Sequence, residues 1–257
     1  MQGMSTAADT LRAHLSQVEA LRQAALSAHP DLRAALAGVR DVQVRRFHAT
    51  YADFLDSPRH GQAATFFLTE LYGHSDYSQR DAQFARIAGA IERLFPAKVM
   101  ALALQLSEVH ALTETLDWQL AQAWQALPPL PPAPPTPALA ARYLACWRQV
   151  GRPADRDRQL QAVMALGWHL AEVVRIPGLR MALRLMRPPA RAAGLSALQQ
   201  VLEDGFDAFT SMGQPDSFLR EVQTRESDWI DSFFHTDMAQ ATRRLARALA
   251  DTPPAPD

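Results

Sequence analysis

The side chains that could carry chemistry are few, and a histidine on an apolar face comes first. His48 lies among Val44, Phe47, Tyr51 and Leu55, which recur at helical spacing. A buried imidazole needs a hydrogen-bond partner because burying an unpaired polar group is costly. The simplest interpretation is a core histidine bonded to a backbone or carboxylate group, and the alternative is a ligand to a cofactor such as haem.

Metal ligands and nucleophiles are less well arranged. His169 precedes Glu172 by three residues, so the two share one helix face. Di-iron bundles use the opposite order, Glu-x-x-His, twice, and the sequence has no second copy. Glu108 and His110 are two residues apart and point in different directions on a helix. The single cysteine, Cys146, has no base nearby in sequence and excludes a cysteine-rich zinc site. We therefore expect no metal and no cofactor.

The most unusual local feature is a run of positive charge. Residues 175–191 contain no acidic side chain and five arginines, Arg175, Arg180, Arg184, Arg187 and Arg191. Leucine and methionine side chains lie between them, so the stretch is basic and amphipathic, which favours an anionic surface, a phosphate or a protein partner. The alternative is a solvated face balanced by the acidic residues Glu203, Asp204 and Asp207. No interleaved aromatic residues are present to stack on bases, so we expect no nucleic acid.

Composition excludes further classes of function. The chain has 257 residues, with 26 basic and 27 acidic side chains, and a net charge of -1 argues against a dedicated nucleic-acid binder. Apolar residues make up 48% of the chain, which is enough for a core. No serine-hydrolase elbow, phosphate loop or dinucleotide fingerprint is present.

These side chains must be positioned by helices, because good helix formers dominate and β-branched residues are few. Thr6 with Asp9 and Ser78 with Asp81 are typical of capping boxes that open helices. A single helix is predicted over 189–212. We expect an all-α fold of eight to ten helices.

Seven prolines within 128–137 exclude a helix there and predict an extended, semi-rigid spacer. We therefore predict two contiguous helical bundles, an N-terminal half over 1–127 and a C-terminal half over 138–250, followed by a disordered tail over 251–257. A role for the prolines as a ligand of SH3-type domains is less favoured, because no basic residue follows until Arg142.

Targeting signals are not evident. The first residues lack the basic and apolar regions of a secretory signal. The longest stretch without charge, between Asp117 and Arg142, is interrupted by the prolines and cannot form a bilayer-spanning helix. The expectation is a cytoplasmic protein without a transmembrane segment.

Two stretches carry a resemblance to a known family. The first reads F-F-L-T-E-L-Y-G over 66–73, and the second runs from L-M-R-P-P-A at 185–190 to G-F-D-A-F at 205–209. Together they resemble a bacterial family nicknamed for the motif Phe-Phe-Leu-Glu-Glu-Leu-Tyr, and the similarity covers about residues 45–234. This chain departs at Thr69, where the nickname has glutamate. The resemblance implies a shared helical fold and no catalytic activity.

Two classes of function stay open. The first is a non-enzymatic helical binding or adaptor protein of the bacterial cytoplasm, with a protein partner or an anionic surface at the arginine stretch. The second is a pocket protein or enzyme that binds a small anionic or apolar ligand between the halves, with arginine gripping the anion and histidine carrying a proton. For the second class the candidate residues are His48, Tyr51, Tyr72, Arg80, His169 and Arg184.

Overall fold

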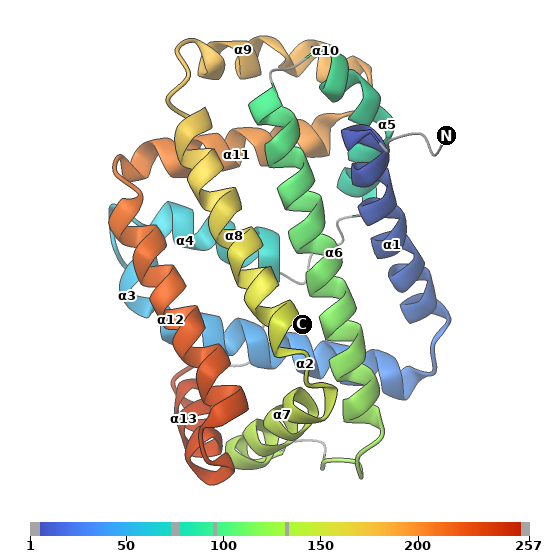
Figure 1. The fold of residues 1–257 in the computed structure, drawn as a ribbon, viewed down its shortest axis with the longest axis vertical. Coiled ribbons are helices and arrows are strands. Elements are labelled where there is room, and N and C mark those ends of the chain that lie inside the picture. Colours follow the sequence, from blue (N-terminus) through green and yellow to red (C-terminus); the bar gives the residue numbers. More distant parts are fainter. Residues whose placement is uncertain (1–5, 73–77, 95–96, 132–133, 253–257) are drawn as a thin grey trace.

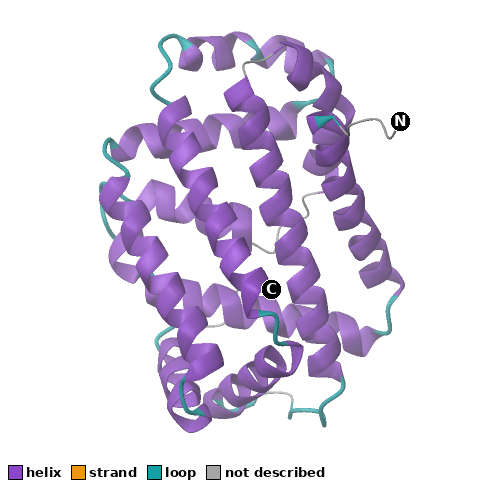
Figure 2. Ribbon diagram, in the orientation of Figure 1, coloured by secondary structure: helices purple, strands orange, loops and turns teal. Residues whose placement is uncertain are grey.

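The computed structural model describes residues 6–72, 78–94, 97–131 and 134–252. Within these residues the chain forms thirteen helices and no strand (Figures 1 and 2), which confirms the all-α prediction. The helices are α1 (Ala7–Ser27), α2 (Pro30–Thr50), α3 (Ala52–Leu55), α4 (Gly61–Tyr72), α5 (Ser78–Leu94), α6 (Ala97–Gln125), α7 (Thr136–Val150), α8 (Pro153–Val173), α9 (Leu179–Leu185), α10 (Arg187–Ala192), α11 (Ser196–Met212), α12 (Asp216–His235) and α13 (Met238–Ala250).

Helix starts follow the local signals. The Thr6 hydroxyl accepts a hydrogen bond from the Asp9 backbone N–H at 3.2 Å, and the Asp9 carboxylate accepts one from the Thr6 N–H. This is the predicted capping box. Helix α5 begins at Ser78, as the second signature predicts. Its Asp81 carboxylate reaches into the protein, where it accepts a hydrogen bond from Arg22 at 2.9 Å and lies 3.0 Å from His110 Nε2.

The prediction of eight to ten helices is too low, because short helices were missed. The stretch 189–212, predicted as one helix, divides into α10 and α11. Gly194 adopts a left-handed backbone between them, with φ of +66°, which ends α10. Helix α3 is also separate from α2, because Tyr51 leaves the helical region at φ −118°.

The two predicted halves are packed together. Helix α6 lies along α8, α2 contacts α7 and α13, and α4 crosses α11 (Figure 1). One core cluster contains Val39 and Leu120 from before the proline segment with Tyr143 and Phe233 from after it. No clear division into two bundles is visible in the described residues, because periodicity identifies a buried face without identifying its partner. The boundary at 128–137 stays a prediction, and the tail over 253–257 lies outside the described residues.

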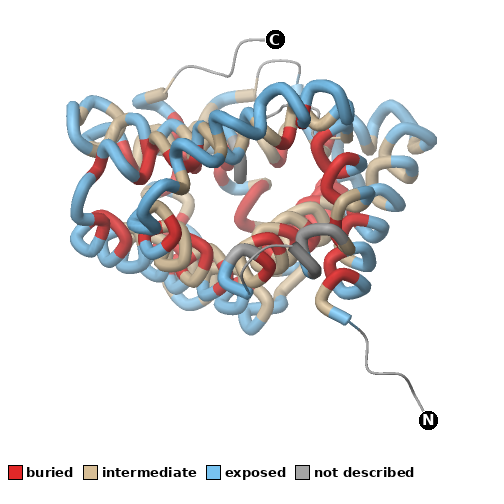
Figure 3. The backbone as a smooth tube through the Cα atoms, turned by 90° about the horizontal axis from the view of Figure 1, so that it is seen from above, coloured by how far each residue is buried: buried red, intermediate tan, exposed pale blue. Residues whose placement is uncertain are grey.

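Helices α9 and α10 lie across one end of the molecule, and α7 and α13 lie at the opposite end (Figure 1). Buried residues face inward between the helices, and exposed residues cover the outside (Figure 3). None of the described helices combines the length and apolar character needed to cross a bilayer.

Candidate functional site

Two cavities lie among helices from both sides of the proline segment. The first, the central cavity, has a volume of about 70 Å³ and is lined from α2, α4, α6, α7, α8 and α12. The second, the end cavity, has a volume of about 130 Å³ and lies beneath α9. The two cavities differ in the polarity of their walls.

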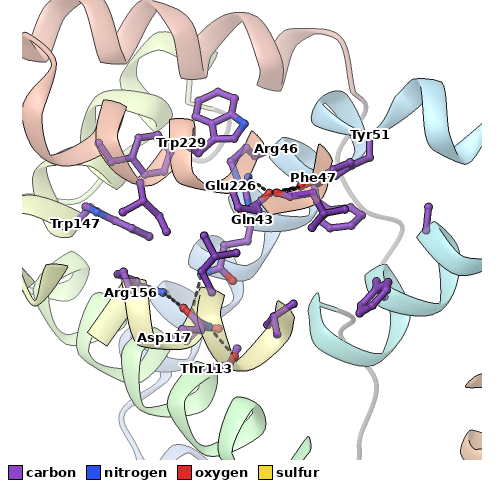
Figure 4. Close-up of a pocket in the computed structure, with 18 of the residues that line it drawn as sticks. Gln43, Arg46, Phe47, Tyr51, Thr113, Asp117, Trp147, Arg156, Glu226 and Trp229 are labelled. Carbon is purple, nitrogen blue, oxygen red and sulfur yellow. Dashed lines mark hydrogen bonds and ion pairs between the residues drawn. The ribbon is translucent and has the colours of Figure 1, made fainter. Parts of the chain in front are cut away.

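An ion pair between α2 and α12 forms one side of the central cavity (Figure 4). Arg46 donates from Nη1 and Nη2 to the two carboxylate oxygens of Glu226, at 2.8 and 2.9 Å. The Tyr51 hydroxyl donates to Glu226 Oε1 at 2.8 Å. The pair is bidentate and nearly buried, so removing one partner would leave the other charge buried without compensation.

Asp117 forms the other side. It is 3% exposed and accepts a hydrogen bond from Gln43 Nε2 at 2.7 Å. Burial raises the pKa of Asp117, and the positive charges of Arg40 and Arg156 oppose this rise. Arg156 points toward Asp117 in Figure 4, and its guanidinium lies 3.9 Å from the centre of the Trp147 ring.

Aromatic rings form much of the remaining wall of the central cavity, beside aliphatic side chains and the polar Thr113 and Gln159. The rings are those of Phe47, Tyr51, Phe67, Tyr143, Trp147, Phe218, Trp229 and Phe233. The buried indole N–H of Trp147 has no hydrogen-bond partner within the described part of the chain. A volume of about 70 Å³ holds about five water molecules at roughly 10–15 Å³ each. The cavity is therefore suited to ordered water around charged groups that carry their own partners.

The end cavity is apolar throughout. Its fourteen lining residues are leucine, valine, phenylalanine and one glycine, from α4, α6, α8, α9 and α11 and the residue after α8. Phe66 and Phe67 of the Phe-Phe stretch form one wall, and Leu179 and Leu183 of α9 form the roof. An empty apolar space of this size costs a fold about 3 kcal/mol, at about 24 cal/mol per Å³. Interiors seldom keep such spaces.

A small arginine pocket adjoins the end cavity. It is lined by Arg180, Arg184 and Arg187 of α9 and α10, with Leu183, Glu203, Phe206 and Asp207. Leu183 and Phe206 also line the end cavity, so the two spaces share these walls. The apolar space therefore ends beside guanidinium groups.

Two of these three arginines already have acidic partners. Arg180 lies 2.9 Å from Asp207, and Arg187 Nε donates to Glu203 at 2.7 Å. The hydrogen bonds from Arg187 lower the pKa of Glu203 to about 2. No ion pair is found for Arg184 among the residues described, so this arginine is the one open to an outside anion.

The candidate residues predicted from sequence do not come together. Tyr51 lines the central cavity, and Arg184 lines the arginine pocket. His48 is half-buried on α2 and lines neither cavity. His169 of α8 interacts with α6, where its Nδ1 lies 2.6 Å from Gln105 Oε1.

Arg80 lines neither of these two cavities. Arg80 is buried and lies 3.2 Å from the neighbouring Asp81 carboxylate. The side chain of Tyr72 lies outside the described residues, as does Asp76. Arg80, Asp81 and His110 line a separate small pocket of about 10 Å³, which has room for about one water molecule and not for a larger ligand.

No group of three histidine, cysteine or acidic side chains that could hold a metal ion occurs in the described ranges. Cys146 is buried, and burial raises the pKa of its thiol to about 11, so it stays protonated at neutral pH.

The sequence prediction missed Asp117, although a signal was present. Thr113, Asp117, Leu120 and Trp124 are spaced as successive turns of one helix face. A carboxylate on an otherwise apolar stripe marks a buried polar site. The end cavity left no such signal, because its walls consist of ordinary core residues from distant segments.

Comparison with known proteins adds one assignment. Residues 22–240 match the family model described as "Domain of unknown function (DUF8198)". No curated protein matches the chain, and no solved structure matches it. The matched range includes both stretches on which the resemblance to the Phe-Phe-Leu-Glu-Glu-Leu-Tyr proteins rests, and that resemblance stays a prediction. Because the match spans most of its length, the chain belongs to the DUF8198 family.

Proposed function

We propose that this protein binds an amphipathic anion, a molecule with one alkyl or acyl chain and a carboxylate or phosphate head. The end cavity takes the part of the chain nearest the head, about five or six carbons, and the head lies at the arginine pocket. The observation that carries the proposal is the pair of walls, Leu183 and Phe206, that the apolar and basic spaces have in common.

The apolar part of the ligand follows from the cavity walls. Those that the structure describes offer no polar side chain, so a hydrocarbon segment gains by entering. Each methylene that leaves water contributes about 0.8 kcal/mol. Filling the space also restores the dispersion contacts that an empty cavity lacks.

The charge of the head follows from the arginine pocket. Arg184 supplies a planar fork of donors that suits carboxylate and phosphate oxygens. Glu203 and Asp207 are engaged by Arg187 and Arg180, so they do not neutralise it fully. A cationic head would meet three guanidinium groups and two carboxylates, which carry a net positive charge, and would be repelled.

Binding is proposed without catalysis because the end cavity presents neither a nucleophile nor an acid or base. Of the two classes of function left open by the sequence, this proposal combines the binding role of the first with the ligand type of the second. The ligand lies between α4 and α6 on one side and α8, α9 and α11 on the other, which is between the two predicted halves.

Titration calorimetry with four matched ligands tests the proposal. Dodecanoate and dodecyl phosphate should bind, whereas dodecanol should bind more weakly and dodecyltrimethylammonium should bind weakest. The variant Val201→Phe fills the cavity and should abolish binding of all four ligands. The variant Arg184→Glu should remove the preference for an anionic head while leaving dodecanol unaffected.

The matched control is Arg220→Glu, an exposed arginine on α12 away from both pockets. Its ligand affinities should equal those of the natural protein. Equal affinity for the anionic and cationic ligands, or unchanged binding in folded Val201→Phe, would contradict the proposal. Native mass spectrometry of protein purified from its own host should show a retained amphiphile, and the Val201→Phe variant should lack it.

A further inference from the structure

We propose that the end of the molecule formed by residues 175–191, the end segment, docks on an anionic membrane surface. The inference rests on the proposed function in one respect: the molecule that passes between the membrane and the protein is the amphipathic anion. The docking itself rests on separate observations about the outer face of the end segment, which does not line the end cavity.

The outer face is unusually apolar for a surface. Seven large apolar side chains are exposed among the residues described, and four of them, Ile176, Met181, Leu185 and Met186, fall in this segment. Met181 is 68% exposed and Leu185 is 70% exposed. Large apolar side chains clustered in this way mark a site of contact with a protein or a membrane.

The charge of the segment selects an anionic partner. It has five arginines and no acidic residue. Arg175, Arg184 and Arg191 are exposed and form no ion pair with the described residues, whereas the acids of α11 already hold Arg180 and Arg187. Arginines interleaved with methionine and leucine on a helix are the pattern of a segment that lies in the headgroup region.

A membrane fits this surface better than an acidic protein does. Met181 and Leu185 are exposed on α9, a short helix at one end of the molecule (Figure 1), and neither of them lines a described pocket that a protein partner would fill. A bilayer interface accepts flexible methionine and leucine side chains without a matching shape. A bilayer is also the place where an amphipathic anion with one chain accumulates.

Helix α9 connects the membrane face to the cavity. Leu179 and Leu183 point to the end cavity, while Met181 and Leu185 are exposed on the same seven-residue helix. None of its residues is fully buried, and Gly178 precedes it in a left-handed conformation with φ of +79°. Helix α9 is therefore weakly held by its own contacts. When its outer side chains insert among the headgroups, movement of α9 opens the end cavity toward the lipid.

Vesicle co-sedimentation of the full chain tests this inference. Vesicles of phosphatidylcholine alone should leave the protein in solution, and an equimolar mixture with phosphatidylglycerol should bind it in a salt-sensitive manner. Replacing Arg184 and Arg191 with glutamine should weaken partitioning about fivefold for each arginine removed. Met181→Gln with Leu185→Gln should abolish it, and Arg243→Gln on α13 should leave it unchanged.

The two proposals fail separately in this design. Val201→Phe should lose dodecanoate binding and keep vesicle binding, whereas Met181→Gln with Leu185→Gln should do the reverse. Equal binding to both kinds of vesicle, or no effect of the arginine and apolar variants, overturns membrane docking. Binding to polyglutamate but not to anionic vesicles, with the same dependence on Arg184, assigns the surface to an acidic protein and also overturns it.

Discussion

The central cavity and the end cavity share α4, α6 and α8 in their walls, but they are built in opposite ways. Around the central cavity, Arg46 and Glu226 satisfy each other, and Asp117 is met by Gln43. Around the end cavity, none of the described wall residues has a polar side chain to satisfy. The first arrangement specifies how helices meet, because a buried charge tolerates few positions. The second leaves space that only a hydrocarbon fills, so the apolar cavity is where we place the ligand.

The helices that enclose the two spaces differ as well. The central cavity is enclosed mainly by α2, α6, α8 and α12, each of at least twenty residues. The roof of the end cavity is α9, with seven residues and none fully buried. Short, exposed elements open at low free energy. In the proposed function, ligand exchange therefore takes place at the end of the molecule that has the shorter and more exposed helix.

The largest expected effect comes from breaking the central ion pair. Arg46→Ala leaves the Glu226 carboxylate buried with only Tyr51 as a side-chain donor, so the free energy of unfolding should fall by about 3–5 kcal/mol. Urea unfolding measures this. The control is Arg12→Ala, whose exposed pair with Asp9 should contribute less than about 1 kcal/mol. Similar losses in the two variants would remove the structural role of the central cavity.

Ligand should stabilise the protein through the end cavity alone. At a dodecanoate concentration of about a hundred times Kd, the free energy of unfolding should rise by about 2.7 kcal/mol. Val201→Phe should show no rise, and Asp117→Asn should show the full rise, because Asp117 lines only the central cavity. A thermal shift that depends on Asp117 and not on Val201 would reverse our assignment of the two cavities.

The pH dependence of stability should report Asp117. Because its pKa is raised in the folded state, the folded protein binds this proton more tightly than the unfolded chain does. Stability therefore falls as pH rises from about 4 to the folded-state pKa, by about 1.4 kcal/mol for each unit of elevation. Asp117→Asn keeps an oxygen for Gln43 and should lose this slope. Urea titrations at several pH values measure the free energy of unfolding. An equal pH dependence in Asp117→Asn and the natural protein would contradict the role given to Asp117.

The smallest effect is expected at the arginine pocket. Arg187 is exposed and pairs with Glu203, so Arg187→Ala should lower the free energy of unfolding by less than about 1 kcal/mol. Dodecanoate affinity should fall in the same variant, since the Glu203 carboxylate loses its partner and repels the head. Unfolding and calorimetry on one preparation separate these effects. A large stability loss with unchanged affinity would make the pocket purely structural.

Much of the helical fold could be predicted from local patterns. The capping box at Thr6 and the helix start at Ser78 are set by neighbouring residues, so sequence reveals them. The acids of α11, Glu203 and Asp207, could also be named as partners of the arginine stretch, because α11 follows it closely in sequence.

The cavities could not be predicted in the same way. The central cavity brings Arg46 to Glu226 across 180 positions, and the pattern of apolar residues does not reveal which helix faces which. The end cavity depends on what its walls leave unfilled, and a sequence of leucines and valines reads the same whether they touch or not. His48 is a candidate by its residue type and its apolar neighbours in sequence, but it lines neither cavity.

The ring of Phe67 separates the two cavities, since it lines both. Its edge packs against Phe209, with ring centres 5.7 Å apart, so it has little freedom to move alone. A hydrocarbon that presses on one side of this partition changes the room left for water on the other. By thermodynamic reciprocity, the hydration of the central cavity then influences the affinity for the hydrocarbon. Phe67 would thus couple the occupancy of the two cavities.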